Sequence, residues 1–261
     1  MIRAVSENGI GSFEDERIID GSYTGFVNDD PIQDSIVIRE GDELILFSNY
    51  QYSPGTVITV DTGSFTFCFL PGTLIATPSG EVAVEALAIG DPILTADGRT
   101  IPVRWIGRQA LFTAFGLPEG RTPVLIQAGA LAPGVPCRDL RVTAGPAMIL
   151  DGIAVEAGAL VNGSTIRRIP RAELGARLTV FHIETEGHEV ILAEGAPSET
   201  YLGHMDRAQF DNGAEHAALY GEAAIEEMPL PRAMSRRQVL PPIQARIAAR
   251  AAALMEDKQA A

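Results

Sequence analysis

The fold of this chain is decided by Cys68-Phe69-Leu70-Pro71-Gly72-Thr73-Leu74-Ile75-Ala76-Thr77-Pro78-Ser79-Gly80 and by Val84-Glu85-Ala86-Leu87-Ala88-Ile89-Gly90-Asp91-Pro92-Ile93-Leu94-Thr95 shortly after it. The two runs contain a cysteine, a Gly-Thr pair, and apolar stretches that are separated by turn-forming residues. Short apolar stretches bounded by Gly, Pro, Ser and Asp predict β-strands rather than helices. The sequence therefore predicts an all-β region that begins at Cys68.

Residues 68–98 as a whole resemble the opening block of Hint domains, the hedgehog/intein autoprocessing fold. Further stretches resemble a bacterial Hint subfamily, so that the resemblance extends over roughly residues 67–202. These stretches are Val103-Arg104-Trp105-Ile106-Gly107-Arg108, Ile126-Gln127-Ala128-Gly129-Ala130-Leu131, Asp139-Leu140-Arg141-Val142, Leu160-Val161-Asn162-Gly163 and His188-Glu189-Val190-Ile191-Leu192-Ala193-Glu194-Gly195. The resemblance implies a Hint-type horseshoe of short strands.

We divide the chain into three parts. Residues 1–67 form a small acidic β unit, in which two apolar runs around Glu40-Gly41-Asp42 predict a hairpin and residues 56–60 predict another strand. Residues 68–202 form the Hint domain. Residues 203–261 form a C-terminal extension with a helix.

Local patterns predict two further features. Asp97-Gly98, Asp151-Gly152 and Asn162-Gly163 are strong two-residue hairpin signals. Residues 243–255 have a helical pattern in which apolar residues gather near one face. We expect this helix to pack on the domain, and the alternative is a contact with a membrane or a partner.

The resemblance implies that Cys68 is the nucleophile of a self-cleavage reaction. Its thiol would attack the carbonyl carbon of Phe67 and exchange a peptide bond for a thioester. The reaction needs an ionised thiol, a proton for the departing nitrogen and donors for the oxyanion. Phe67 is therefore the expected cleavage site.

The second family block is normally Thr-x-x-His or Ser-x-x-His, and its histidine supplies the proton to the scissile amide. Thr143 matches this block, but Pro146 stands where the histidine is expected. Proline has no side-chain donor and no backbone N–H. The usual acid is therefore missing.

Two histidines are candidates for a compensating role. His182 lies in a run that resembles a late Hint strand, at the place of an acidic residue near the active centre, and imidazole titrates near neutrality. The alternative for His182 is a structural role. His188 is expected to have a structural or supporting role. It would share one face with His182 on an unbroken strand, which Gly187 could interrupt. We expect His216, like His204, at the surface.

The predicted function is autoprocessing by an N–S acyl shift, with cleavage between Phe67 and Cys68 and no splicing. Inteins end in His-Asn, and no such pair follows Gly195. The substrate is the chain's own N-terminal segment, and the acceptor is water, a small nucleophile or a protein nucleophile. The alternative is a degenerate Hint domain that serves as a structural or binding module of a secreted or surface protein.

Composition narrows the partners. The formal net charge is -14, which disfavours nucleic acid and anionic membranes. No apolar run is long enough for a membrane span, and no signal peptide is visible, so we expect a soluble protein, with export without a classical signal left open. The second cysteine, Cys137, is expected to be small and partly buried. No pattern indicates a metal or another cofactor.

Overall fold

The computed structural model describes residues 68–113, 117, 122–200, 207, 210–221 and 225–260, and near the N-terminus the backbone of five strands. It divides into two compact units, Met1–Ser64 and Phe65–Ala261. The described residues of the C-terminal extension belong to the second unit. The three-part division at residues 67 and 202 stays a prediction.

The first unit contains a five-stranded sheet with the order β1-β4-β3-β2-β5. Its strands are β1 (Ile2–Ser6), β2 (Ser22–Val27), β3 (Ile36–Glu40), β4 (Glu43–Ser48) and β5 (Val60–Asp61). β3 and β4 pair antiparallel with Glu40 opposite Glu43, so the hairpin predicted at this place is confirmed. The strand predicted over residues 56–60 lies outside the described residues except for Val60.

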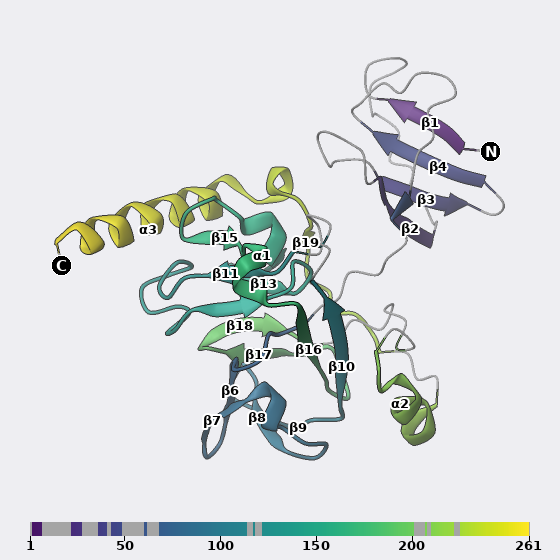
Figure 1. Ribbon diagram of the computed structural model, residues 1–261, viewed down its shortest axis with the longest axis horizontal. Coiled ribbons are helices and arrows are strands. Elements are labelled where there is room, and N and C mark those ends of the chain that lie inside the picture. Colours follow the sequence, from purple (N-terminus) through teal and green to yellow (C-terminus); the bar gives the residue numbers. More distant parts are fainter. Residues whose placement is uncertain are drawn as a thin grey trace. The chain divides into compact units, whose positions relative to one another are not determined.

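The second unit consists mostly of short strands, as predicted (Figure 1). The strands are β6 (Leu74–Thr77), β7 (Gly80–Ala83), β8 (Pro92–Leu94), β9 (Thr100–Pro102), β10 (Trp105–Phe112), β11 (Val124–Ile126), β12 (Leu140–Val142), β13 (Ala147–Leu150), β14 (Ile153–Glu156), β15 (Ile166–Arg168), β16 (Arg177–Glu184), β17 (Val190–Ala193), β18 (Ala196–Glu199) and β19 (Arg232–Ala233). The helices are α1 (Arg171–Leu174), α2 (Gly213–Tyr220) and α3 (Pro241–Ala260), with 3₁₀ helices η1 (Val84–Ala86), η3 (Ala157–Leu160) and η5 (Arg236–Gln238).

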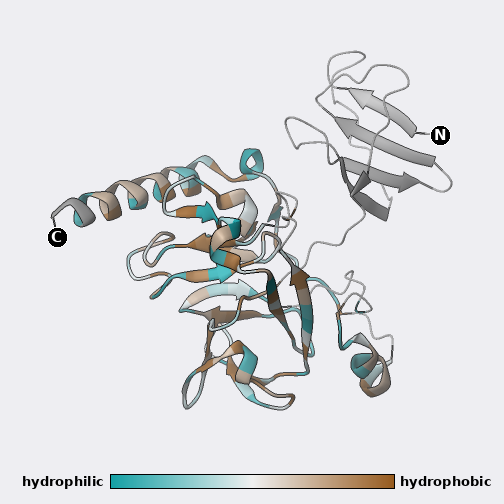
Figure 2. Ribbon diagram, in the orientation of Figure 1, coloured by the Kyte–Doolittle hydropathy of each residue, from teal (hydrophilic) through white to brown (hydrophobic). Residues whose placement is uncertain are grey.

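The strands of the second unit form four sheets. The largest has seven strands in the order β19-β14-β13-β18-β17-β6-β7. The two long strands β10 and β16 pair antiparallel along their whole length, and β12-β11-β15 and β8-β9 complete the set. Figure 2 shows apolar residues concentrated on these strands.

Two of the three hairpin signals are confirmed. Asp151 and Gly152 join β13 to β14 with φ values of 53° and 78°, the left-handed conformations that a two-residue hairpin turn requires. Asp97-Gly98 lies between the paired strands β8 and β9. The hairpin prediction for Asn162-Gly163 was wrong. The Asn162 side chain accepts the N–H groups of Ser164 and Ile166, and this local turn leads from η3 into β15.

Helix α3 packs on the second unit through its apolar face, as expected. Ile243 and Ile247 are buried in the main hydrophobic core, and Leu254 packs against it. Arg246 forms an ion pair with Asp151, which ties the helix to the β13–β14 turn. Among the described residues, no helix has the length and apolar character that crossing a membrane requires.

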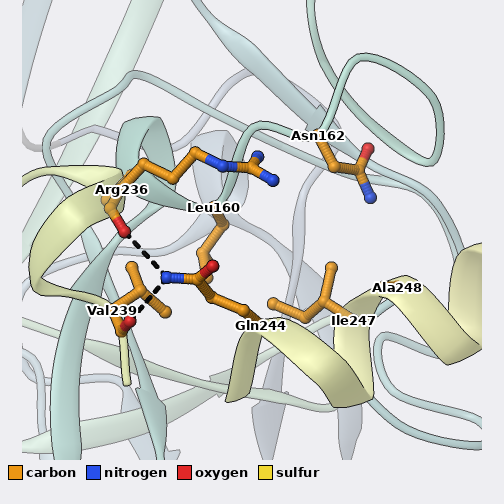
Figure 3. A pocket seen from close by; sticks show the side chains of 8 residues that line it. Leu160, Asn162, Arg236, Val239, Gln244, Ile247 and Ala248 are labelled. Atoms are coloured by element: carbon orange, nitrogen blue, oxygen red, sulfur yellow. Dashed lines mark hydrogen bonds between the residues drawn. The ribbon is translucent and has the colours of Figure 1, made fainter. Parts of the chain in front are cut away.

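A hollow of about 40 Å³ lies between η3 and the start of α3 (Figure 3). The Gln244 amide crosses it and donates to the carbonyls of Arg236 and Val239. A space of this size holds a few water molecules rather than a substrate. The reacting groups therefore lie elsewhere.

Candidate active site

The backbone of residues 68–70 lies between β12 and β16. Phe69 exchanges two hydrogen bonds with Phe181 of β16, at N···O distances of 2.7 and 2.9 Å. On its other side, the Leu70 N–H donates to the Arg141 carbonyl and the Thr143 N–H donates to the Cys68 carbonyl. This short segment therefore joins two sheets and is held from both sides.

Thr143 contacts the nitrogen of the predicted scissile bond. The Cys68 N–H donates to Thr143 Oγ1 at 2.9 Å, and the same hydroxyl lies 3.3 Å from the Cys68 carbonyl, to which it donates. The structure thus brings together two of the residues that the sequence selected. Phe67, the predicted cleavage site, lies outside the described residues.

His182 is the cross-strand neighbour of Cys68. Phe69 and Phe181 form a hydrogen-bonded antiparallel pair, so Cys68 stands opposite His182 in the adjoining non-hydrogen-bonded pair. In such pairs the Cβ atoms lie about 4.5–5.5 Å apart and the side chains project to the same face. The apolar clusters support this arrangement. Cys68 and Val180, which lies two residues from His182 on the same strand face, share one cluster, whereas Phe181 belongs to the main hydrophobic core.

The side chain of Cys68 is completely buried. It belongs to an apolar cluster, the Cys68 cluster, formed by Cys68, Leu70, Trp105, Leu125, Ile169, Val180, Phe210 and Ile225. Burial raises the pKa of the Cys68 thiol well above its ordinary value. The thiol is therefore held in its protonated form and needs a neighbouring base to react at neutral pH.

Other residues of the opening block stabilise local turns of its backbone. The Glu85 carboxylate accepts the Gly72 N–H at 2.9 Å, and the Asp91 carboxylate accepts the Ala88 N–H at 2.8 Å. The Thr73 hydroxyl donates to the Leu70 carbonyl at 2.8 Å. These contacts explain why a Gly-Thr pair and two acidic residues accompany the cysteine.

Pro146 is buried and stabilises the fold through its backbone. Its carbonyl accepts the Ala157 N–H at 2.9 Å, at the junction between β14 and η3. Its side chain offers no donor or acceptor.

His188 and His182 do not lie on one unbroken strand. Strand β16 ends at Glu184, and His188 lies in the connection to β17. Its Nδ1 accepts the Met228 N–H at 3.1 Å, and its Nε2 lies 3.3 Å from Glu199. These contacts belong to a separate buried cluster.

That second cluster contains two buried carboxylates with different pKa values. Burial raises the pKa of Glu156 to about 8. Burial also acts to raise the pKa of Glu199, but hydrogen bonds from His188 and Arg232 outweigh it, and the pKa of Glu199 falls below its ordinary value. The Ala147 N–H also donates to Glu199 at 2.7 Å, just after Pro146. The cluster joins β13, β14, β18 and β19.

Sequence reasoning missed a third group, which surrounds Glu184. His216 was expected at the surface but is buried, and its Nε2 lies 2.8 Å from Glu184. Arg207 donates to the same carboxylate at 2.9 Å. His204 lies outside the described residues. Arg207 and His216 lie in the weakly patterned stretch of residues 206–227, and no local sequence signal there predicts these contacts.

Cys137 is exposed rather than partly buried. Its thiol and the carboxylates of Glu81 and Glu194 offer ligand atoms within 4.8 Å of one another. Arg138 forms ion pairs with both carboxylates, 2.7 Å from Glu194. Because the Arg138 guanidinium already pairs with both carboxylates, we assign no metal to the group.

The region around Cys68 is similar to known proteins. The Hint domain family model matches residues 67–205. Among solved structures, the MchDnaB-1 intein is 16% identical, with coverage of 51% of this chain and 99% of its own, and gives a TM-score of 0.37. The zinc-bound Msm DnaB1 intein splicing domain is 18% identical, with coverage of 51% and 99% and a TM-score of 0.38. An intein-like domain from Clostridium thermocellum is 15% identical, with coverage of 52% and 99% and a TM-score of 0.37. No curated protein matches the chain.

Proposed function

This chain belongs to the Hint domain family, and from that premise we propose that it cleaves its own Phe67–Cys68 peptide bond by an N–S acyl shift, without splicing. The predicted family and the predicted all-β fold with a C-terminal helix are confirmed. The fold is of the autoprocessing type, and Hint domains act on their own flanking segments. The particular bond, the nucleophile and the outcome are our proposal.

In the proposed first step, a bond forms between Cys68 Sγ and the Phe67 carbonyl carbon. The bond between that carbon and the Cys68 nitrogen breaks. His182 accepts the thiol proton, and as the carbon–nitrogen bond breaks this proton is delivered to the departing nitrogen, which becomes an amine, so His182 ends neutral and no proton is gained or lost. In the second step, water or an added thiol attacks the thioester, which frees residues 1–67 and restores the Cys68 thiol.

The observation that carries the proposal is the Cys68 N–H bond to Thr143 Oγ1 at 2.9 Å. It places a hydroxyl at the nitrogen that must be protonated when the peptide bond breaks. The register of Phe69 with Phe181 adds His182 on the same face as the thiol. A thiol, a titratable imidazole and a hydroxyl therefore gather around one peptide nitrogen, which supports the proposal.

Ligation is not part of the proposal. Splicing domains of this family use a His-Asn pair at the end of the last strand, and here β18 runs through Ala196–Glu199 into Thr200. The Thr200 hydroxyl accepts the Glu189 N–H at 2.8 Å, which is a structural contact. The released fragment therefore ends in a free acid or in an adduct with the acceptor.

The test is thiol-induced cleavage of the purified chain. Dithiothreitol near neutral pH should release fragments 1–67 and 68–261, detected by intact mass. Cys68→Ala should stay whole, whereas Cys137→Ser should cleave like the parent, because Cys137 is exposed and outside the Cys68 cluster. Cleavage of Cys68→Ala at the same bond would exclude the proposed nucleophile.

A second candidate is a catalytically degenerate domain that acts as a structural or binding module. The specific observation in its favour is Pro146, which is buried and offers no side-chain donor. In that case the parent chain stays whole over days in dithiothreitol, and Pro146→His gains cleavage because it supplies the missing acid. The same mass measurement therefore separates the two candidates.

A further inference from the structure

Residues 210–221, which we call the strap, bind along β10 next to the candidate active site. The strap contains Phe210 and helix α2. Asp211 and Asn212 bind the β10 backbone: the Ala110 N–H donates to Asp211 at 2.9 Å, the Arg108 N–H donates to Asn212 at 2.8 Å, and the Asn212 amide donates to the Ile106 carbonyl at 2.9 Å. The strap thus satisfies backbone groups along the strand edge that does not face β16.

Phe210 inserts its ring between Trp105 and His182. Its ring centroid lies 5.4 Å from that of Trp105, edge to face, and 6.0 Å from that of His182. The place for the ring exists because β10 has a glycine opposite His182: a Cβ on Gly107 would come within 2.7 Å of the Phe210 ring. Phe210 is itself 3% exposed and belongs to the Cys68 cluster.

Helix α2 has two further anchors beyond the β10 backbone. His216 of α2 binds the buried carboxylate of Glu184, the last residue of β16, to which Arg207, outside the strap, also donates. The Tyr220 hydroxyl donates to the Arg104 carbonyl at 2.7 Å, and the Arg104 guanidinium lies 4.5 Å from the Tyr220 ring centroid. Polar contacts therefore hold the strap at both ends, while Phe210 supplies its apolar contact with the site.

We propose that the strap is an autoinhibitory cover: while it is docked, Phe210 seals Cys68 and His182 from solvent, and the strap must leave β10 before an acceptor reaches the thioester. The cover consists of one apolar side chain held in place by hydrogen bonds at a strand edge. Such contacts open locally at lower free energy than the core unfolds. The proposal rests on the proposed function for its consequence, but the covering of the thiol can be measured without any cleavage.

The experiment measures alkylation of Cys68 by N-ethylmaleimide in a Cys137→Ser background, where Cys68 is the remaining thiol. Asn212→Ala removes two hydrogen bonds to β10 and leaves the Cys68 cluster intact, and it should speed alkylation about tenfold. Phe210→Ala should speed it at least as much. Gly107→Ala should act in the same direction, because its methyl group displaces the Phe210 ring.

Leu219→Ala is the matched control, since Leu219 is on α2 but is 54% exposed. It should leave the alkylation rate unchanged. Urea separates strap opening from global unfolding, because the dependence of a rate on denaturant scales with the surface exposed. Alkylation through strap opening should depend weakly on urea, and a dependence as steep as that of global unfolding would overturn the cover.

Cleavage in dithiothreitol completes the test. The Asn212→Ala variant should cleave faster than its parent by a factor similar to that seen for alkylation. Faster alkylation with slower cleavage would overturn autoinhibition and make Phe210 a positioning residue for His182. Faster alkylation with no cleavage in any variant would support the cover and contradict the proposed function. Unchanged alkylation in Asn212→Ala and Phe210→Ala would overturn the cover.

Discussion

At the scale of single residues, the proposed cleavage depends on three side chains around one peptide nitrogen. Cys68 is buried with a raised pKa, Thr143 binds its N–H, and His182 stands opposite it across the strand pair. A buried thiol is a poor nucleophile by itself, so its neighbours have to supply the proton transfers. Variants of Thr143 and of His182 test these two neighbours separately.

Thr143→Val should slow cleavage at least about tenfold, because it removes the hydroxyl that binds the Cys68 nitrogen and leaves the shape of the side chain nearly unchanged. Thr143→Ser keeps the hydroxyl and should cleave close to the parent rate. The measurement is the appearance of fragment 68–261 over time. Equal rates for the valine and serine variants would remove Thr143 from the mechanism.

His182→Gln should slow cleavage about 100-fold, since it removes the group proposed to accept the thiol proton. His188→Gln is the matched comparison: His188 contacts Glu199 and Met228 in the separate cluster, so its loss should lower stability with little effect on the rate per folded molecule. Rates are compared at a temperature where both variants are folded. A larger rate loss in His188→Gln would reverse the two assignments.

At the scale of elements, the buried Glu156–Glu199–Arg232 group ties the C-terminal strand β19 to the large sheet. Arg232 donates to both oxygens of Glu199, while Glu156 lies on β14, which pairs with β19. Burial raises the pKa of Glu156 to about 8, so the folded state holds its proton where the unfolded chain releases it. Stability from this group is full below the ordinary glutamate pKa of about 4.3 and is lost as pH rises through 8.

Glu156→Gln should therefore flatten the pH dependence of stability between pH 5 and 9 and raise stability at pH 9, by about 5 kcal/mol at most. An amide has nearly the same shape and does not ionise. Urea unfolding at several pH values provides the measurement. A parent chain whose stability does not fall from pH 5 to pH 9 would contradict the raised pKa of Glu156.

The elements that could be predicted from the sequence are those whose determinants are local. The turn at Asp151-Gly152 follows from two residues that accept left-handed backbone, and α3 follows from its apolar periodicity. Asn162-Gly163 failed because the Asn162 side chain bound the backbone and formed a turn without a preceding strand. The ion pairs of Glu184 and Glu199 join residues far apart in the chain, and no pattern within one segment indicates them.

The candidate site was predictable in its parts but not in its assembly. Family resemblance selected Cys68 through the opening block and Thr143 through the second block, and it selected His182 as a titratable residue at the place of an acidic one in a late Hint strand. Its position opposite Cys68 depends on the pairing register of Phe69 with Phe181, which is a tertiary property. The packing of Phe210 against Gly107 joins residues from separate segments, so only the structure reveals it.

At the scale of the whole molecule, the proposed cleavage site lies just after the boundary between the two compact units. The first unit ends at Ser64, and the proposed cut follows Phe67. Cleavage there would separate the five-stranded unit from the second unit without interrupting any of the described strands. The proposed reaction is thus consistent with release of an intact folded unit.

Hydroxylamine trapping tests the central claim most directly, because hydroxylamine attacks a thioester readily and leaves a hydroxamate on the acyl group. The purified chain is treated with hydroxylamine near neutral pH, and the N-terminal fragment is analysed by intact mass and fragmentation. The account predicts a fragment of residues 1–67 with a hydroxamate on the carboxyl group of Phe67, absent from Cys68→Ala. A chain that stays whole, or a hydroxamate that forms equally in Cys68→Ala, would contradict an acyl shift to Cys68.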